Sequence, residues 1–122
     1  MAYIDGFLIP IQKKNLAKYR RIASKAAKIW RKYGALEVRE CWGDDLKPQG
    51  MDVTFPRLAK LKAGETVVFS WIVYRSRAHR DRVNAKIIKD PEVAKMMSGD
   101  DMPFDMKRMS YGGFKVIVDE AS

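Results

Sequence analysis

Apolar and polar positions recur along the chain with two different spacings, and each spacing predicts one kind of element. Residues 13–33 carry apolar side chains at alternating steps of three and four, which places them on one face of a helix. Gly34 follows where a helix commonly ends in a left-handed residue. Residues 3–11 are a short apolar run closed by proline, and residues 66–74 are β-branched and aromatic throughout. Both runs predict strands.

The same patterns predict the remaining strands and helices. Residues 35–42 alternate apolar and charged side chains, as in a strand, and residues 109–118 form the last strand. Ser76 can cap a helix that runs to residue 89. The pair Asp90-Pro91 then predicts the start of a short helix, which Gly99 should end.

A long connection separates the second and third predicted strands. Residues 43–64 contain three glycines and two prolines, a composition typical of turns and loops. Within this segment, Thr54 followed by Pro56 predicts one helical turn. We expect Leu58 and Leu61 of that turn to face the interior.

The resulting order is strand, helix, strand, strand, helix, strand, within one domain spanning residues 1–122. Chains with this order usually form a ferredoxin-like α+β fold, a four-stranded antiparallel sheet with the helices on one face. The other face of such a sheet should then carry polar residues at alternate positions.

The predicted strands do not carry those polar residues. In residues 66–74, Phe69 and Trp71 point to one side while Val68 and Ile72 point to the other, so both faces of the strand are apolar. The first strand has the same two-sided character. Because too little chain remains to build a second layer, we predict a homodimer in which two sheets enclose a barrel-like apolar space.

Charge is concentrated in a single element. The chain has 24 Lys and Arg against 15 Asp and Glu, a net charge of +9 at pH 7. Residues 13–33 hold nine of the basic side chains and none of the acidic ones, so the rest of the chain is balanced. An anionic partner, if the protein has one, should bind along this helix.

Composition limits the class of protein. A chain of 122 residues with 47% hydrophobic side chains can build a core without metal or disulfide staples. Cys41 is the sole cysteine, and the first ten residues have Asp5 but no basic leader, so we expect a cytoplasmic protein that is not membrane-bound. One cysteine and one histidine also argue against an all-protein zinc site.

Several segments resemble one family over essentially the whole chain. They are residues 3–7 (YIDGF), 34–45, 67–71 (VVFSW), 76–91, 102–105 (MPFD) and 108–114 (RMSYGGF). Together they resemble the YbaA-like family of uncharacterised bacterial proteins. Arg75 and the pair Leu46-Lys47 depart from the family's pattern, and all three lie in expected loops. Membership implies the dimeric α+β barrel superfamily, in agreement with the two-sided strands, but it implies no activity.

Polar residues within apolar strands are the candidates for binding a small molecule. We predict that Asp5, Trp71, Arg108 and Tyr111 line such a site, in which the glycine pair Gly112-Gly113 leaves room for a ligand. The alternative is that they are structural, with Trp71 packed as a core aromatic.

The superfamily also includes oxygenases that hold haem with a histidine and a tryptophan. Trp71 and His79 are similar in placement, but Asp5 stands where those enzymes use asparagine. We therefore interpret His79 as a solvated helix residue and predict no cofactor.

Two further binding hypotheses follow from charge. The basic helix suits nucleic-acid phosphates, and its candidate contacts are Lys14, Lys18, Arg21, Lys25, Lys28 and Lys32. The acidic pairs Asp44-Asp45 and Asp100-Asp101, with Asp105, could attract a divalent cation but lack the spacing of a calcium loop, so we predict no metal.

Three functions remain open from the sequence. The first is binding, with or without turnover, of a small apolar molecule in the barrel. The second is association with RNA or DNA through the basic helix, and the third is a structural or regulatory dimer. The sequence does not decide whether the protein is an enzyme.

Overall fold

Four strands and four α-helices make up the fold of the computed structural model, which describes residues 2–98 and 102–121. The elements, in chain order, are β1 (Tyr3–Gln12), α1 (Leu16–Lys32), β2 (Glu37–Trp42), α2 (Phe55–Leu58), β3 (Glu65–Tyr74), α3 (Arg77–Lys89), α4 (Pro91–Met97) and β4 (Ser110–Lys115). Short 3-10 turns lie at Lys13–Asn15 and Met106–Arg108.

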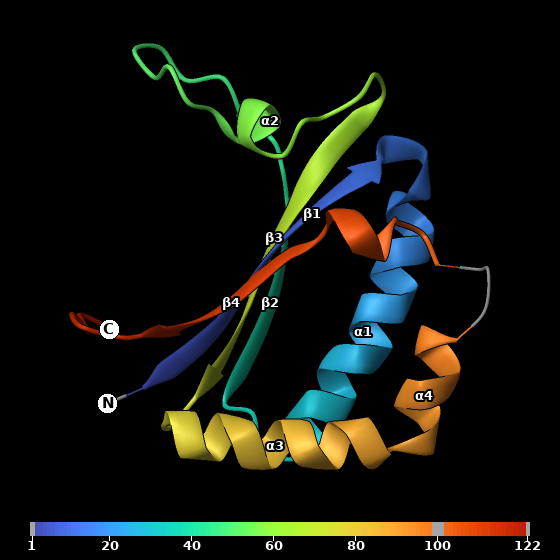
Figure 1. The fold of residues 1–122 in the computed structure, drawn as a ribbon, viewed down its shortest axis with the longest axis vertical. Coiled ribbons are helices and arrows are strands. Elements are labelled where there is room, and N and C mark those ends of the chain that lie inside the picture. The colour runs from blue at the N-terminus through green and yellow to red at the C-terminus, as the bar shows by residue number, and fades with distance from the viewer. Residues whose placement is uncertain (1, 99–101, 122) are drawn as a thin grey trace.

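The strands form one antiparallel sheet in the order β2-β3-β1-β4. Helices α1 and α3 lie on the same side of this sheet, and α4 continues from α3 toward the start of α1 (Figure 1). The prediction of an α+β chain with a four-stranded antiparallel sheet is therefore confirmed. No helix among the residues described has the length and apolar character to span a membrane.

Strand register divides the sheet into two faces. Tyr3, Asp5, Ile9 and Ile11 of β1 point toward the helices and are buried, and we call this side the covered face. The opposite side, which we call the open face, carries the alternate residues. These are Ile4, Gly6 and Leu8 of β1, Glu37, Arg39 and Cys41 of β2, Phe69, Trp71 and Val73 of β3, and Ser110, Gly112 and Phe114 of β4.

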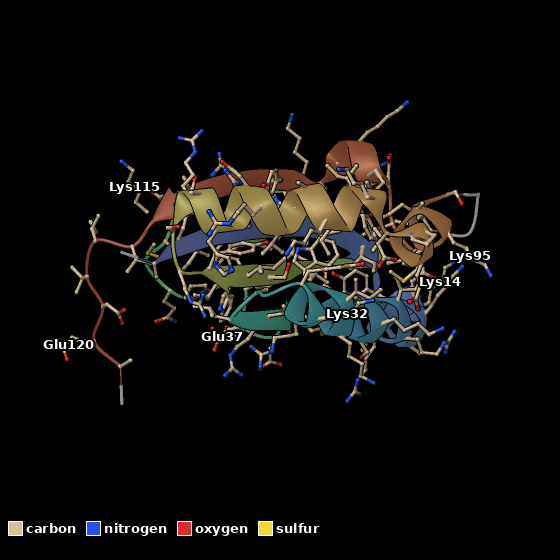
Figure 2. All side chains as sticks on the ribbon, turned by 90° about the horizontal axis from the view of Figure 1, so that it is seen from below. Lys14, Lys32, Glu37, Lys95, Lys115 and Glu120 are labelled. Carbon is tan, nitrogen blue, oxygen red and sulfur yellow. The ribbon has the colours of Figure 1, made fainter. Side chains whose placement is uncertain are left out.

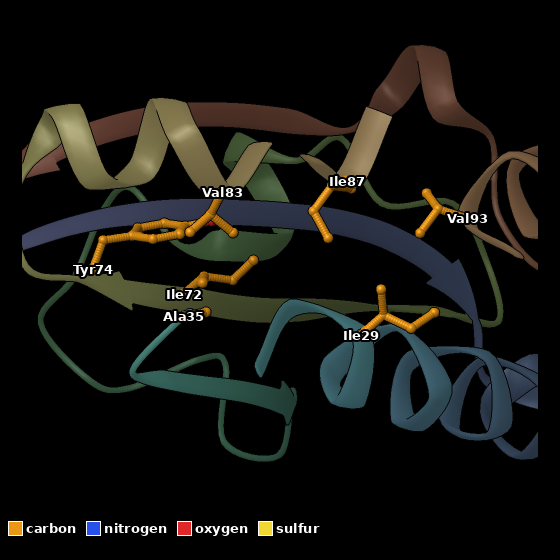
Figure 3. Packing of buried hydrophobic residues seen from close by; sticks show 7 residues of the cluster. All are labelled: Ile29, Ala35, Ile72, Tyr74, Val83, Ile87 and Val93. Atoms are coloured by element: carbon orange, nitrogen blue, oxygen red, sulfur yellow. The ribbon is translucent and has the colours of Figure 1, made fainter. Parts of the chain in front are cut away.

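The core lies between the covered face and the helices. One cluster joins Ile29 of α1, Ile72 and Tyr74 of β3, and Val83 and Ile87 of α3 (Figure 3). A second cluster packs Tyr19 and Ala23 of α1 against β1 and β3. Tyr19 and Ala23 are buried and Trp30 packs against the first cluster, so the apolar stripe predicted from the sequence lies on the side that α1 buries.

Helix ends follow the predicted capping signals. The Ser76 hydroxyl accepts a hydrogen bond from the backbone N–H of His79 at 3.1 Å. The Asp90 carboxylate caps α4 by accepting from the N–H groups of Glu92 and Val93. Gly34 has φ +116°, a left-handed conformation that glycine adopts without strain.

Two local predictions were wrong. Leu58 does not face the interior, because α2 is a single turn on the surface and 62% of this side chain is exposed. The last strand ends at Lys115 rather than residue 118, close to where β1 begins at Tyr3. The Val116 N–H still donates to the Ala2 carbonyl at 3.1 Å, but Ile117 and Val118 are exposed. The predicted helix stop at Gly99 lies outside the residues described.

Candidate ligand site on the open face

A hollow of about 570 Å³ lies on the open face. Two glycines, Gly6 of β1 and Gly112 of β4, are directly paired in the sheet and leave its floor without side chains. Apolar side chains from three strands and α2 surround the floor: Ile4, Leu8, Phe55, Phe69, Trp71 and Phe114. The volume is within the range of small-molecule sites, which are about 300 to 1,000 Å³.

Three aromatic rings form one wall of the hollow. Phe69 contacts Trp71 edge-to-face, with ring centroids 5.7 Å apart. Phe55 of α2 contacts Phe69 in the same manner at 6.1 Å. Phe69 is nevertheless 46% exposed and Phe114 is 60% exposed. About half of the Phe55 and Phe69 surfaces therefore remains accessible to an apolar partner.

One corner of the open face is polar. The Glu37 carboxylate accepts a hydrogen bond from the Trp71 indole Nε1 at 3.1 Å and one from Arg39 Nε at 3.1 Å. The Trp71 hydrogen bond, followed by the Arg39 contacts, lowers the pKa of Glu37. The carboxylate therefore stays ionised at neutral pH and holds the Trp71 ring in one orientation.

A second polar cluster lies on the covered face. Asp5 is buried and accepts a hydrogen bond from Arg80 Nη1 at 2.8 Å. The same Nη1 donates to the Tyr111 hydroxyl at 2.8 Å, and the guanidinium lies 4.9 Å from the centre of the Tyr3 ring. Burial acts to lower the pKa of Arg80, but Asp5, Tyr111, Asp81 and Tyr3 together outweigh it and raise this pKa. Burial and then Asp5 raise the pKa of Tyr111. The cluster is an internally satisfied ion pair.

The four residues predicted to line one site are divided between three places. Trp71 lines the hollow on the open face, whereas Tyr111 borders the hollow from β4 but directs its ring to the covered face, where it stacks on Phe7. Asp5 lies on the covered face, where Tyr111 is linked to it through Arg80. Arg108 lies beside a separate depression of about 200 Å³ next to Leu58. Trp71 is half-buried in the single chain, so it is not part of the helix-covered core.

Arg108 instead links two distant segments. Its guanidinium donates two hydrogen bonds to the Glu65 carboxylate, at 2.6 and 2.9 Å, and one to the Lys60 carbonyl at 3.0 Å. The hydrogen bond from Arg108 lowers the pKa of Glu65 to about 2. Arg108 therefore ties the long connection to the start of β3.

Sequence reasoning missed Arg80 as a partner of the predicted residues. Arg80 was assigned no role in the predicted site, yet its side chain is only 13% exposed. Arg80 precedes Val83 and Ile87 by three and seven residues, which is the spacing of one helix face. That spacing is the signal that could have placed Arg80 against the sheet.

The interpretation of His79 as a solvated residue was also wrong. His79 is buried against the Tyr74 ring, and its Nδ1 accepts a hydrogen bond from the Arg75 backbone N–H. Burial, followed by the nearby Arg75, lowers its pKa. Trp71 and His79 lie on opposite sides of the sheet, so the two cannot act on one ligand.

The predicted nucleic-acid contacts form one stripe along α1, which we call the basic stripe: Lys14, Lys18, Arg21, Lys25, Lys28 and Lys32. Most of these side chains are exposed, and Lys18 is half-buried. Lys32 lies 3.9 Å from the Asp90 carboxylate and 4.9 Å from the centre of the Tyr33 ring. Lys14 and Lys32 both lie on the α1 side of the molecule (Figure 2).

The acidic residues considered for a metal do not converge in the part of the chain that the structure describes. No group of three or more His, Cys, Asp or Glu side chains in this part is placed to hold a metal ion. Asp105 instead accepts a hydrogen bond from the Lys107 N–H. Asp100 and Asp101 lie outside the residues described.

Comparison with known proteins places the chain in a family. Residues 2–106 match the model of the family described as "Protein of unknown function (DUF1428)". The chain belongs to this family. It is 43% identical over 120 residues to "Uncharacterized protein YbaA" of Escherichia coli K12, covering 98% of this chain and all of the relative. The Shigella flexneri protein of that name gives the same values. The resemblance stated from the sequence is therefore confirmed.

Similarity to solved structures is low. A de novo designed protein, Foldit4, is 10% identical with a TM-score of 0.47, covering 95% of this chain and 99% of the design. A structure titled as a putative amidohydrolase/peptidase from Burkholderia cenocepacia is 13% identical with a TM-score of 0.32; the match covers 94% of this chain and 27% of that one. Neither similarity assigns a chemistry to the hollow.

Proposed function

We propose that the protein is a homodimer that binds a small apolar molecule between the open faces of its two copies. Each copy contributes a ferredoxin-like sheet, and the pair encloses the space in the manner of a dimeric α+β barrel. The observation that carries this proposal is the glycine-floored apolar hollow. Turnover of the ligand is not part of the proposal, because the polar groups near the hollow are already paired with one another.

The strand order supports the ferredoxin-like arrangement. In the order β2-β3-β1-β4, β3 lies between β1 and β2, and β1 lies between β3 and β4. Each β-α-β unit therefore has one strand of the other unit inserted between its own two strands. This interleaving is the split β-α-β pattern of ferredoxin-like folds.

The charge of the open face favours a second copy as the partner. Its charged strand residues are all paired, Glu37 with Arg39 and Glu65 with Arg108, so these residues add no net charge to the face in a chain of +9. The basic stripe lies on α1, across the sheet from this face. Two copies can therefore join open face to open face without placing their strongly basic surfaces together.

Binding of Nile red, an uncharged apolar dye, tests the proposed site. A Cβ at Gly112 would meet Phe114 at 3.7 Å, an ordinary contact, so Gly112→Val should fill the hollow without disrupting the sheet. We expect wild-type protein to bind the dye and Gly112→Val to bind at least about tenfold more weakly. The matched control is Ile88→Val on the outer surface of α3, where 79% of the side chain is exposed. Equal dye binding by all three proteins would contradict the site.

A second candidate function, association with RNA or DNA, is favoured by the exposure of the basic stripe. Replacing Lys25, Lys28 and Lys32 by Glu removes three positive charges and adds three negative ones. If this surface binds phosphates, the triple variant should lose salt-sensitive retention of RNA and show no excess absorbance at 260 nm after purification. Retention equal to that of the wild type would exclude the basic stripe as the binding surface.

A further inference from the structure

We propose that residues 43–64, which we call the arm, close the apolar hollow of the partner copy, so that each ligand site is built from both chains. This inference rests on the proposed homodimer. It adds that the hollow of one chain is incomplete without the arm of the other.

The size of the open face gives the first argument. Neighbouring strands lie about 4.8 Å apart, and each residue adds about 3.3 Å to the length of a strand. At these spacings, strands β1 to β4 make a face with a flat area of about 500 Å². A stable interface usually buries about 800 Å² on each partner. The flat area of the sheet is smaller than this accessible area, so contacts outside the sheet would add to the stability of the proposed dimer.

The arm has the apolar side chains to supply such contacts. Met51 is 60% exposed, Val53 64%, Phe55 45% and Leu58 62%. Four large apolar side chains within eight residues are an unusual exposed patch for a segment that serves only as a connection. In Figure 1 the arm projects beyond the end of the sheet, away from α1 and α3.

The arm is also held in a defined position. Arg108 donates to the Lys60 carbonyl, and the Gly43 N–H donates to the Val67 carbonyl at 2.9 Å. Within the arm, the Arg57 side chain donates to the Asp52 carbonyl at 3.0 Å, and Thr54 caps the turn of α2. An arm fixed at both ends loses less conformational entropy on association than a free loop.

The position of α2 directs the arm toward a second sheet. Phe55 contacts Phe69, so α2 lies on the open side and forms part of the rim of the hollow. Two sheets packed face to face are about 10 Å apart. Because α2 lies on the open side of its own sheet, the arm occupies the layer in which the sheet of the partner copy would lie.

Replacing exposed apolar side chains of the arm by aspartate tests the arm without disturbing the chain's own core. Val53→Asp and Leu58→Asp each place a carboxylate on the arm, and Ile88→Asp is the control on an exposed site of α3. The dimer dissociation constant is measured by sedimentation over a dilution series, and Nile red affinity is measured on the same samples. Circular dichroism of each variant establishes that it is folded.

We expect Val53→Asp and Leu58→Asp to raise the dimer dissociation constant at least about tenfold and to weaken dye binding, while Ile88→Asp changes neither. A dimer that is unchanged by both arm variants but disrupted by Trp71→Ala would overturn the role of the arm and leave the proposed dimer intact. A wild-type protein that is monomeric throughout the series would overturn the dimer and, with it, this inference.

Discussion

The two faces of the sheet contain similar side chains in different surroundings. On the covered face, Tyr74 is fully buried and packs against α3. On the open face, Phe69 and Phe114 are about half exposed or more, although both are large aromatic residues within strands. The covered face is completed by the chain's own helices, whereas the open face remains without cover in a single copy.

Polar groups show the same contrast. The carboxylate on the covered face, Asp5, is held by Arg80 and lies within the core. The carboxylate on the open face, Glu37, holds Trp71 at the edge of the hollow. One pair therefore stabilises the folded chain, and the other orients a ring that a ligand or a second copy can contact. In the proposed dimer, folding of the chain and association of two chains would therefore depend on opposite sides of one sheet.

The largest expected difference between the faces is in the loss of unfolding free energy when an aromatic side chain is truncated, a buried one on the covered face or a half-buried one on the open face. Tyr74→Ala should lower the free energy of unfolding by about 3 to 5 kcal/mol, as is usual when a buried aromatic side chain is removed. Trp71→Ala should cost less in the single chain and should instead weaken the dimer. Chemical denaturation at several protein concentrations separates the two, and an equal, concentration-independent loss for both variants would contradict the distinction.

Breaking the ion pair of the covered face should have the next largest effect. Asp5→Asn removes the buried carboxylate partner of Arg80 and leaves the nearly buried guanidinium with only the exposed Asp81, so it should cost up to about 3 kcal/mol. The double variant Asp5→Asn with Arg80→Met should recover part of this loss, because no buried charge then remains. A loss of less than about 0.5 kcal/mol for Asp5→Asn would mean that the pair is accessible to water.

Neighbouring glycines of β4 offer a matched comparison of the faces. A Cβ at Gly113 would clash with the Tyr3 hydroxyl and ring, so Gly113→Ala should cost about 1 to 3 kcal/mol. Gly112→Ala projects into the hollow and should change stability by less than about 1 kcal/mol. Thermal unfolding compares the two, and a larger loss for Gly112→Ala would reverse the assignment of faces.

Acid should weaken the contact that anchors the arm. Because the pKa of Glu65 is lowered from 4.5 to about 2 in the folded chain, its stabilising contribution is complete above pH 4.5 and is lost as the pH falls toward 2. Glu65→Gln should therefore reduce the difference in unfolding free energy between pH 5 and pH 2. If the variant and wild type have the same pH dependence, Glu65 does not carry this contact.

The smallest expected effect on stability is that of the basic stripe. The Lys25, Lys28 and Lys32 to Glu variant alters exposed positions that take no part in either core cluster. Its unfolding free energy should remain within about 1 kcal/mol of the wild type, since exposed substitutions are usually nearly neutral. A much larger loss would show that these lysines support α1 rather than serve a partner.

Periodicity and capping residues predicted most of the fold because those signals are local. The stripe of α1, the Ser76 and Asp90 caps and the two-sided apolar pattern of β3 all depend on neighbours within a few residues. The errors concern long-range contacts. Leu58 and His79 were misplaced because burial depends on which distant segment lies above them, and β4 was predicted too long because its end is set by the start of β1.

The candidate site was predicted only in part for the same reason. Trp71 was predicted as a lining residue and the glycine pair as leaving room for a ligand, and Trp71 with Gly112 lines the hollow. Asp5 and Arg108 were grouped with them although they lie elsewhere, because strand pairing is not visible in one sequence. The pairing of Gly6 with Gly112, which makes the floor, became apparent only from the register.

A native mass spectrum of the wild-type protein, purified at low salt, tests most directly whether the open face is covered by a second copy. The account predicts a mass of twice 14.0 kDa, with additional mass when an apolar ligand is retained. Trp71→Ala should shift the spectrum toward the monomer. A wild-type spectrum that contains the 14.0 kDa monomer alone at every protein concentration would contradict the account.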